Sequence, residues 1–166
     1  MNYRMGTYED LDCICGMIKE AICNMDNNGI PQWDEVYPTW NDFKRDIDND
    51  TLYVVEDERD LIAVYVINKE ADEAYDRCTW SGTDEKACLL HRFCVSPKYQ
   101  NRGLGRTILN YIENQAVGMG YTSIRLDVFT QNPYALKMYD RNEYLKRGYA
   151  NWRKGRFVLM EKVLVQ

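Results

Sequence analysis

The apolar residues of this chain recur with two periods, one typical of helices and one typical of strands. Between residues 11 and 25 they return at three- and four-residue steps, which predicts an amphipathic helix that ends at the turn residues of Asp26–Gly29. The apolar run Ala87–Val95 and the alternating segment Ser123–Phe129 instead predict two strands. Elements of both kinds therefore contribute to the core.

Turn residues and helix caps divide the rest of the chain. A charged turn over Asp57–Asp60 separates two β-branched and aromatic runs, which predicts a hairpin, and Asn132-Pro133 is typical of a helix start. Further strands are expected at Tyr3–Thr7, Thr51–Glu56, Leu61–Asn68, Leu145–Ala150 and Phe157–Val165, the last two joined through Lys154-Gly155, and further helices near Thr39, over Thr107–Met119 and from Pro133.

The resulting order is strand, two helices, three strands, helix, strand, helix and two strands. Antiparallel hairpins then flank a strand-helix-strand core, which predicts a mixed α/β sheet. The chain shows no linker, internal repeat or low-complexity tract, so we expect residues 1–166 to form a single domain.

The composition is that of an ordinary globular protein, with 45% hydrophobic residues and no apolar run near the ~20 residues that a membrane span needs. The segment Met1–Asp10 lacks the features of a secretory signal, so we expect a cytoplasmic protein with no membrane partner. The six cysteines and the single histidine match no zinc pattern. We therefore expect free thiols and no metal site.

The net charge is −5, from 21 basic and 26 acidic residues. A surface that binds nucleic acid normally carries a clustered basic patch, so this balance argues against a nucleic-acid partner. It fits a neutral or cationic small substrate.

The most distinctive stretch is the turn Gln100-Asn101-Arg102-Gly103-Leu104-Gly105-Arg106, which follows a predicted strand and opens a predicted helix. Its glycines let the backbone come close to a ligand, and the N–H groups and dipole of a helix start favour an anion. We expect this turn to hold phosphate; the alternative is an ordinary strand-to-helix turn. A P-loop is disfavoured because the lysine that this motif places after its glycines is missing.

A second helix start, at Asn132, follows the next core strand. Ligands of α/β sheets bind outside the carboxyl ends of the strands. We therefore expect the turn at Gly103 and the helix start at Asn132 to face a common place.

The segment Ile30–Trp40 is rich in aromatic residues, acids and prolines and has no clean period, which predicts a loop. Such a loop could cover a pocket and select an amine through Trp33, Glu35 and Tyr37. The alternative is a loop that its tryptophans attach to the core. The polar, acidic segment Lys69–Lys86 is expected to be a long connection with mostly solvated charges.

The ordered motifs resemble those of the GCN5-related N-acetyltransferase (GNAT) superfamily over essentially the whole chain. Gln100, Gly103 and Gly105 match the acyl-CoA pyrophosphate loop of that family. The stretch Leu126-Asp127-Val128, followed by Asn132, Ala135 and Tyr139, matches its downstream block. The resemblance implies a mixed, mostly antiparallel sheet of about seven strands with helices on both faces.

The resemblance also implies acetyl-CoA as the cofactor. Backbone groups of Phe93, Cys94 and Val95 would contact the pantetheine arm, Asn132 would touch it again, and Tyr139 would lie near the sulfur. The full set of implied cofactor contacts is Phe93, Cys94, Val95, Gln100, Asn101, Arg102, Gly103, Leu104, Gly105, Arg106, Asn132 and Tyr139.

One departure concerns the residues that follow Tyr139. Where the family usually has Gly-Phe, this chain has Glu143-Tyr144, and we expect Asn142 to supply the tight turn instead.

Amide formation needs an acid for the departing thiolate, and Tyr139 is the candidate. A phenol with a reference pKa near ~10 is protonated at neutral pH, when a thiol with a pKa near ~8.5 leaves as thiolate. Asn132 and Tyr139 are two helical turns apart and share a face. The alternative is a tyrosine that only packs under the sheet.

The candidate base is Asp127, at a position where some members of the family have a catalytic glutamate. The alternative is an ion pair with Arg125 or Arg141. Glu35 and His91 are rival bases. Cys94 could suggest an acyl-cysteine route, but a small buried thiol is the favoured interpretation.

Taken together, the sequence predicts an acetyl-CoA-dependent N-acetyltransferase that acts on the amine of a small molecule or peptide. The competing hypothesis is a non-catalytic acyl-CoA-binding domain that senses or docks. The last hairpin could also pair across a homodimer.

Overall fold

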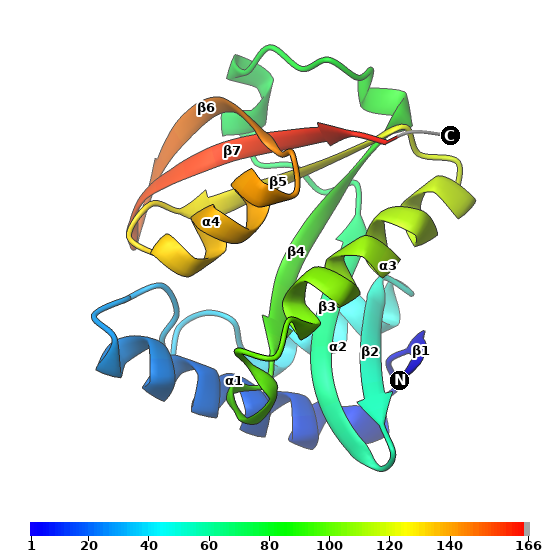
Figure 1. Ribbon diagram of the computed structural model, residues 1–166, viewed down its shortest axis with the longest axis vertical. Helices are drawn as coiled ribbons and strands as arrows, with labels where there is room; N and C mark the ends of the chain where they lie inside the picture. The colour runs from blue at the N-terminus through cyan, green and yellow to red at the C-terminus, as the bar shows by residue number, and fades with distance from the viewer. Residues whose placement is uncertain (165–166) are drawn as a thin grey trace. The chain divides into compact units, whose positions relative to one another are not determined.

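The computed structural model describes residues 1–164 and has the predicted order of elements (Figure 1). Its helices are α1 (Leu11–Asn27), α2 (Trp40–Asp48), α3 (Leu104–Gly118) and α4 (Pro133–Arg141), with short 3-10 turns η1 (Tyr8–Asp10), η2 (Glu73–Arg77), η3 (Asp84–Lys86) and η4 (Pro97–Tyr99). Its strands are β1 (Asn2–Met5), β2 (Leu52–Asp57), β3 (Asp60–Asn68), β4 (Ala87–Val95), β5 (Ser123–Phe129), β6 (Leu145–Trp152) and β7 (Gly155–Val163).

The strands form one seven-stranded sheet in the order β1-β2-β3-β4-β5-β7-β6. The β1–β2, β2–β3, β5–β7 and β6–β7 pairs are antiparallel. Only a short parallel register joins β4 to β5, from Ala87↔Ser123 to Leu89↔Arg125. The mixed, mostly antiparallel sheet with helices on both faces that the sequence predicts is thereby confirmed.

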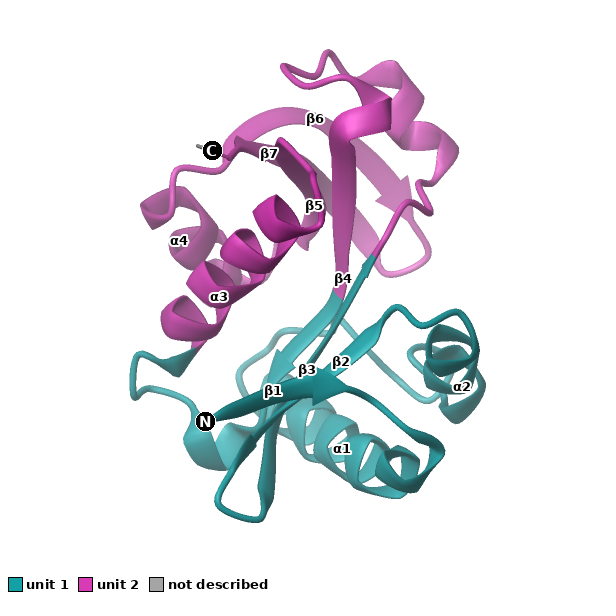
Figure 2. Ribbon diagram, turned by 90° about the vertical axis from the view of Figure 1, so that its right-hand side faces the viewer, with its two compact units in different colours: residues 1–67, 92–104 teal, residues 68–91, 105–166 magenta. Residues whose placement is uncertain are grey.

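Contacts divide the described chain into two compact units, and β4 runs from one into the other (Figure 2). Unit 1 comprises residues 1–67 and 92–104, and unit 2 comprises residues 68–91 together with the chain from residue 105 onward. The single domain that the sequence suggests stays a prediction.

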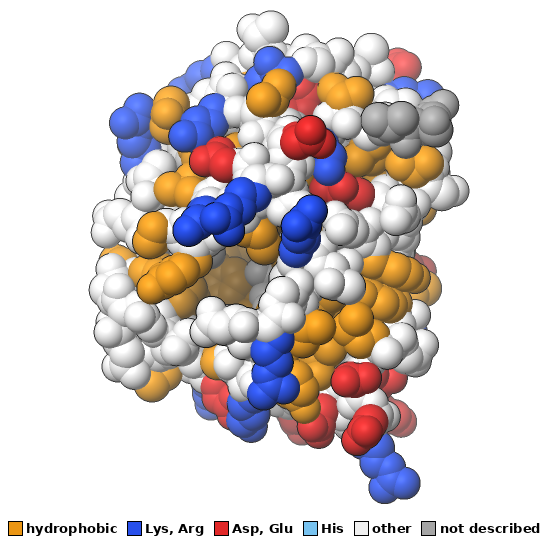
Figure 3. All heavy atoms as spheres, viewed as in Figure 1, with side chains coloured by type: hydrophobic (Ala, Val, Ile, Leu, Met, Phe, Trp, Pro, Cys, Tyr) orange, Lys and Arg blue, Asp and Glu red, His pale blue; other side chains and the backbone are white. Residues whose placement is uncertain are grey.

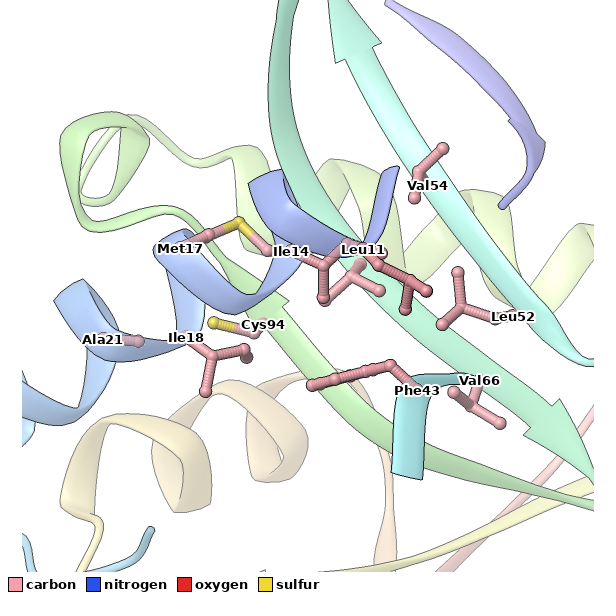
Figure 4. Packing of buried hydrophobic residues seen from close by; sticks show 11 residues of the cluster. Leu11, Ile14, Met17, Ile18, Ala21, Phe43, Leu52, Val54, Val66 and Cys94 are labelled. Carbon is pink, nitrogen blue, oxygen red and sulfur yellow. The ribbon is translucent and has the colours of Figure 1, made fainter. Parts of the chain in front are cut away.

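The core of unit 1 lies between two helices and one face of the β2–β3 hairpin (Figure 4). Leu11, Ile14 and Ile18 of α1 and Phe43 of α2 pack there with Val54, which is fully buried. The apolar stripe of the first helix is therefore core packing. The whole of β3 after Leu61 is buried, which explains its nearly continuous apolar sequence.

In unit 2 the two faces of the β5–β7 pair have different cover. On one face, Glu113 of α3 forms an ion pair with Lys162 of β7 at 2.7 Å. On the other face lie Arg125 and Leu159, and this face packs against the connection between β3 and β4. Leu159 and Tyr75 share a buried cluster there.

That connection, Lys69–Lys86, is more structured than the sequence suggests. It contains η2 and η3 and buries Ala74 and Tyr75, although its acidic side chains are exposed. The backbone N–H groups of Ser81 and Gly82 donate to the buried carboxylate of Glu161, at 2.8 and 3.0 Å. The charges are thus solvated as expected, whereas the backbone is fixed.

Several boundaries differ from the sequence prediction, and two of them lie at glycines. The last hairpin turns through Arg153-Lys154, and Gly155, at φ 140°, is already the first residue of β7. Helix α3 begins at Leu104 rather than at Thr107, so its first turn lies inside the glycine-rich segment. In both places a glycine that the sequence pattern assigns to a turn lies inside the regular element instead.

The surface carries charges of both signs. On the face shown in Figure 3, basic, acidic and apolar side chains lie interspersed. Within residues 1–164, the longest apolar helices fall short of what a membrane crossing requires.

Candidate active site

The glycine-rich turn between β4 and α3 is shaped by two residues with left-handed backbone. Asn101 has φ 61° and Gly103 has φ 75°. A side chain at Gly103 would meet nothing within 4 Å, so glycine is favoured there by its backbone angle rather than by crowding. The turn therefore bends sharply enough for α3 to start at Leu104.

The other glycine of the motif, Gly105, has a different role. A Cβ atom at this position would lie 3.2 Å from Sδ of Met138, so the lack of a side chain lets α3 and α4 approach closely. Gly105 lies in the first turn of α3, where backbone N–H groups have no partner inside the helix. Close packing of α3 against α4 therefore favours glycine at this position.

Charged side chains accompany this helix start. Asn101, Arg102 and Arg106 are exposed, and the guanidinium of Arg102 lies 5.4 Å from the ring centre of Tyr99. Left-handed backbone, a helix N-terminus and two exposed guanidinium groups are the features that bind a diphosphate. The residues present therefore fit the pyrophosphate of coenzyme A.

Gln100 has a structural task in the same turn. Its Nε2 donates to the carbonyl of Val95 at 2.9 Å, and its Oε1 accepts from Asn24 of α1 at 3.4 Å. The side chain thus ties the turn to the end of β4 and to α1. The Val95 carbonyl also accepts a weak hydrogen bond from the Cys94 thiol, at 3.7 Å.

The end of β4 carries the three residues that the resemblance assigns to the pantetheine arm. Phe93 and Val95 are half-buried, whereas Cys94 is buried in the core of unit 1 (Figure 4). Burial raises the pKa of the Cys94 thiol to about 12. A thiol with that pKa carries almost no thiolate at neutral pH, so the acyl-cysteine route is disfavoured.

All six cysteines are free thiols, as the sequence predicts. None is therefore committed to a disulfide.

Just before this segment, β4 contains a buried arginine that sequence reasoning missed. Arg92 has φ 49°, and its Nε and Nη2 donate to the carboxylate of Asp46 at 2.7 and 2.6 Å. Its Nη1 donates to the hydroxyl of Tyr37 at 2.8 Å. An arginine inside an apolar strand was the available signal, because such a residue needs a buried partner.

The aromatic loop sends its three candidate side chains in different directions. Trp33 packs against the core of unit 1, Glu35 is exposed, and Tyr37 is 37% exposed with its hydroxyl on Arg92. The carboxylate of Asp34 accepts from the backbone N–H groups of Val36 and Tyr37, which fixes a tight turn. Trp33 thus fits the interpretation of a loop attached to the core.

The predicted start of α4 is confirmed. Asn132 is the N-cap, its Oδ1 accepts from the backbone N–H of Ala135 at 3.1 Å, and Pro133 is the first helical residue. This cap fixes the start of the helix that carries Tyr139.

Tyr139 is 8% exposed and packs edge-on against Tyr144, with ring centres 5.3 Å apart. Burial, with a smaller effect from the negative charge of Asp127, raises the pKa of Tyr139 above its usual value. The phenol therefore keeps its proton at neutral pH, as a general acid must. The same burial also suits a packing role.

The turn after α4 corrects one expectation. Glu143, not Asn142, adopts the left-handed conformation, with φ 67°. Asn142 has φ −102° and its Nδ2 donates to the carbonyl of Met138 at 2.7 Å. Tyr144 is 2% exposed and fills the place where the family usually has phenylalanine.

Asp127 lies on the face of β5 that the β3–β4 connection covers. Its carboxylate accepts a hydrogen bond from the hydroxyl of Tyr75 at 2.8 Å. The guanidinium of Arg125 is directed to Asp84 and to the carbonyl of Gly82, at 2.6 and 2.8 Å. Sequence reasoning missed Tyr75, because no local pattern links two residues 52 positions apart.

The rival base His91 is involved in a backbone contact. Its Nε2 lies 3.0 Å from the carbonyl oxygen of Glu70. That contact holds the ring against the start of the β3–β4 connection.

Comparison with solved structures defines the class of fold. A GNAT-family acetyltransferase from Streptococcus agalactiae 2603 superposes with a TM-score of 0.84 at 23% identity, covering 99% of this chain and 96% of that one. The yncA protein of Salmonella typhimurium, solved with its cofactor acetyl-CoA, gives a TM-score of 0.72 at 13% identity and covers 100% and 95%. The fold is that of the GNAT acetyltransferases.

Sequence comparison then gives the family. The family model described as "Acetyltransferase (GNAT) family" matches residues 19–144. The uncharacterized N-acetyltransferase YesJ of Bacillus subtilis (strain 168) is 28% identical over 141 residues, which cover 82% of this chain and 77% of that protein. The chain belongs to the GNAT acetyltransferase family, which confirms the predicted enzyme class.

Proposed function

We propose that this protein transfers an acetyl group from acetyl-CoA to the amine of a small molecule or peptide by direct attack. The observation that carries the proposal is the start of α3, where left-handed Asn101 and Gly103 and exposed Arg102 and Arg106 lie at the helix N-terminus. A diphosphate suits this arrangement. The likeness to a fold solved with acetyl-CoA supports the choice of cofactor.

Other segments would hold the rest of the cofactor. Backbone groups of Phe93, Cys94 and Val95 would bind the pantetheine arm, and Asn132 would contact it from the start of α4. When bound, acetyl-CoA supplies the activated acetyl thioester. This chain has to position the thioester, accept a proton from the amine and donate one to the sulfur.

Tyr139 is the proposed general acid. The amine nitrogen forms the new C–N bond, the C–S bond breaks, and the Tyr139 hydroxyl gives its proton to the leaving sulfur. Its raised pKa keeps that proton available across the physiological range. Orientation of the reactants contributes most of the rate in this mechanism, since it is worth up to ~7–11 kcal/mol.

Asp127 is the proposed base, which takes the proton that the amine loses on attack. Its position on β5 and its influence on the pKa of Tyr139 support this assignment. Glu35, exposed in the aromatic loop, and His91, on β4, remain the rivals. If an Asp127→Asn variant keeps the wild-type kcat, the base is Glu35 or His91 instead.

The acceptor side would use the aromatic loop. Glu35 and Tyr37 are exposed there and suit an amine with a cationic or aromatic neighbour, whereas Trp33 supports the loop from below. A peptide and metabolite panel with mass-resolved acetylation would identify the acceptor. Acetylation confined to acidic amines would contradict this choice.

Compartment and assembly complete the proposal. We expect a cytoplasmic enzyme, and β6, at the edge of the sheet, is the strand through which a homodimer would form. Light scattering coupled to size exclusion distinguishes a monomer from a dimer.

The decisive experiment is a free-thiol release assay over an amine panel. The wild type should turn over at least one amine, and Tyr139→Phe should lower kcat at least ~10-fold while acetyl-CoA still raises the melting temperature. Tight cofactor binding with no turnover on any amine would instead support a sensor or docking domain.

A further inference from the structure

A tyrosine in the β3–β4 connection directs its hydroxyl at the proposed base. Tyr75, in η2, is 3% exposed, and its hydroxyl donates to Oδ2 of Asp127 at 2.8 Å. The bond joins two different elements of unit 2, so it forms only when the connection is folded onto β5.

Tyr75 is itself held by packing. Its ring stacks on Trp80, with centres 5.5 Å apart and planes 20° from parallel. The Trp80 Nε1 donates to the carbonyl of Tyr75 at 2.9 Å, and the guanidinium of Arg125 lies 4.5 Å from the Trp80 ring centre. These contacts fix the position of the Tyr75 phenol. A group that orients a catalytic side chain has to be fixed in this way.

Contacts on both sides of Tyr75 anchor the β3–β4 connection. Asp72 caps the start of η2 by accepting from the backbone N–H of Ala74 at 2.9 Å. Ser81 and Gly82 donate to Glu161 of β7, whose carboxylate also accepts from Arg147 at 3.2 Å. Several independent contacts thus maintain the distance between Tyr75 and β5.

Groups on several elements of unit 2 face Asp127 or respond to its charge. Tyr75 faces it from η2, and Tyr139 of α4 senses its charge. Arg125, two positions earlier on β5, is engaged by Asp84, and the residue paired with Asp127 on β7 is the uncharged Leu159. Of these groups, Tyr75 donates a hydrogen bond directly to the carboxylate.

We infer that Tyr75 is a positioning residue for Asp127: its hydroxyl holds one carboxylate oxygen, fixes the side-chain rotamer and keeps the group ionised for proton transfer from the amine. The inference rests on the proposed role of Asp127 as the base. The connection between β3 and β4 thereby becomes part of the catalytic apparatus rather than a solvated link.

The variant that tests this is Tyr75→Phe, because the ring also lines a cavity of about 310 Å³ with Asp76, Trp80 and Arg125. Phenylalanine removes only the hydroxyl and keeps that wall and the stacking on Trp80. A truncation to alanine would change the cavity as well.

The first measurement needs no substrate. A ¹³C NMR titration of the Asp127 carboxyl carbon, identified by its loss in Asp127→Asn, gives the pKa of this group in the apo protein. Loss of a hydrogen bond to the charged form should raise the midpoint by about one pH unit in Tyr75→Phe.

The second measurement is kinetic. Since ionised Asp127 is required, the acid limb of the pH–rate profile should move to higher pH by the same amount in Tyr75→Phe. We expect kcat to fall about tenfold as the carboxylate loses its fixed orientation, with an unchanged KM for acetyl-CoA. Tyr8→Phe is the matched control, because the exposed Tyr8 hydroxyl also donates to a carboxylate, that of Asp48.

The outcomes separate the two assignments. A wild-type midpoint and kcat in Tyr75→Phe, with Asp127→Asn inactive, would overturn the positioning role and keep the base. Wild-type activity in Asp127→Asn would overturn both. Equal losses in Tyr75→Phe and Tyr8→Phe would also overturn the inference, since they would reflect a general loss of stability.

Discussion

Arg92 and Asp46 form a buried two-bond ion pair where β4 departs from regular strand geometry. Their side chains are 6% and 2% exposed, and the guanidinium also holds the hydroxyl of Tyr37. One arginine thus connects β4, α2 and the aromatic loop within unit 1. The strand segment beside the proposed pantetheine contacts is fixed by a pair of charges rather than by apolar packing alone.

Arg92→Lys should destabilise the protein markedly. A lysine cannot reproduce the two-bond fork and leaves part of a buried carboxylate unsatisfied, so we expect the free energy of unfolding to fall by about 2–4 kcal/mol. Urea denaturation measures this loss. The control is Lys44→Met at the exposed Lys44–Asp48 pair, which should leave the free energy of unfolding nearly unchanged. Similar losses at both sites would contradict the argument.

Gly103→Val should remove cofactor binding while the protein stays folded. A β-branched side chain is strained at φ 75°, so the start of α3 would lose its shape. Acetyl-CoA at one hundred times its Kd is expected to raise the Tm of the wild type by about 5–10 °C. That shift should vanish in the variant.

The control for the turn is Gly103→Asn, because asparagine tolerates left-handed backbone, as Asn101 does in the same turn. We expect it to keep most of the thermal shift. A full shift in Gly103→Val would show that the turn does not bind the cofactor.

Glu143→Gly should stabilise the protein. Glu143 has φ 67°, a conformation that costs a non-glycine residue about 1 kcal/mol or more and that glycine adopts freely. Part of the gain is offset by the entropy of glycine in the unfolded chain, so we expect a net increase of ~0.5–1 kcal/mol. Glu143→Ala, which removes the carboxylate but keeps the strain, should give no such gain in the same chemical denaturation.

Asp10 should make stability depend on pH in the acid range. Hydrogen bonds from Arg4, two of them at 2.8 Å, hold the pKa of the Asp10 carboxyl below its usual value. Because the folded-state pKa lies below the unfolded value near ~3.9, the stabilisation is complete above that value and is lost as the pH falls through the folded pKa.

The test is the free energy of unfolding of the wild type and of Asp10→Asn at pH 7, 5 and 3. The gap between them should be widest at neutral pH and should close toward pH 3. Asp26→Asn, at an exposed carboxylate, should show no closing gap. A gap at Asp10 that stays constant with pH would contradict the ionic origin.

Local signals explain what the sequence could predict. The strands Ala87–Val95 and Ser123–Phe129 have the predicted boundaries because their apolar runs end at clear turn residues. The cap at Asn132 was predictable because asparagine followed by proline favours one conformation.

Contacts between distant residues explain what it could not. Arg92 and Asp46 are 46 positions apart, and Tyr75 and Asp127 are 52 apart, so no periodicity relates them. The left-handed turn at Glu143 was missed because a residue that disfavours this conformation occupies it. The start of α3 was placed too late because Gly103 and Gly105 look alike in sequence but serve different purposes.

The hydrogen bonds from Ser81 and Gly82 to Glu161 affect where a tag can be inserted in this protein. The long connection between β3 and β4, Lys69–Lys86, would be the intuitive place for an inserted tag or label. Yet Ser81 and Gly82 are bound to a carboxylate that is 1% exposed, so an insertion there would pull a buried charge away from its donors. The short, exposed turn at Glu58-Arg59 between β2 and β3 is the better insertion point.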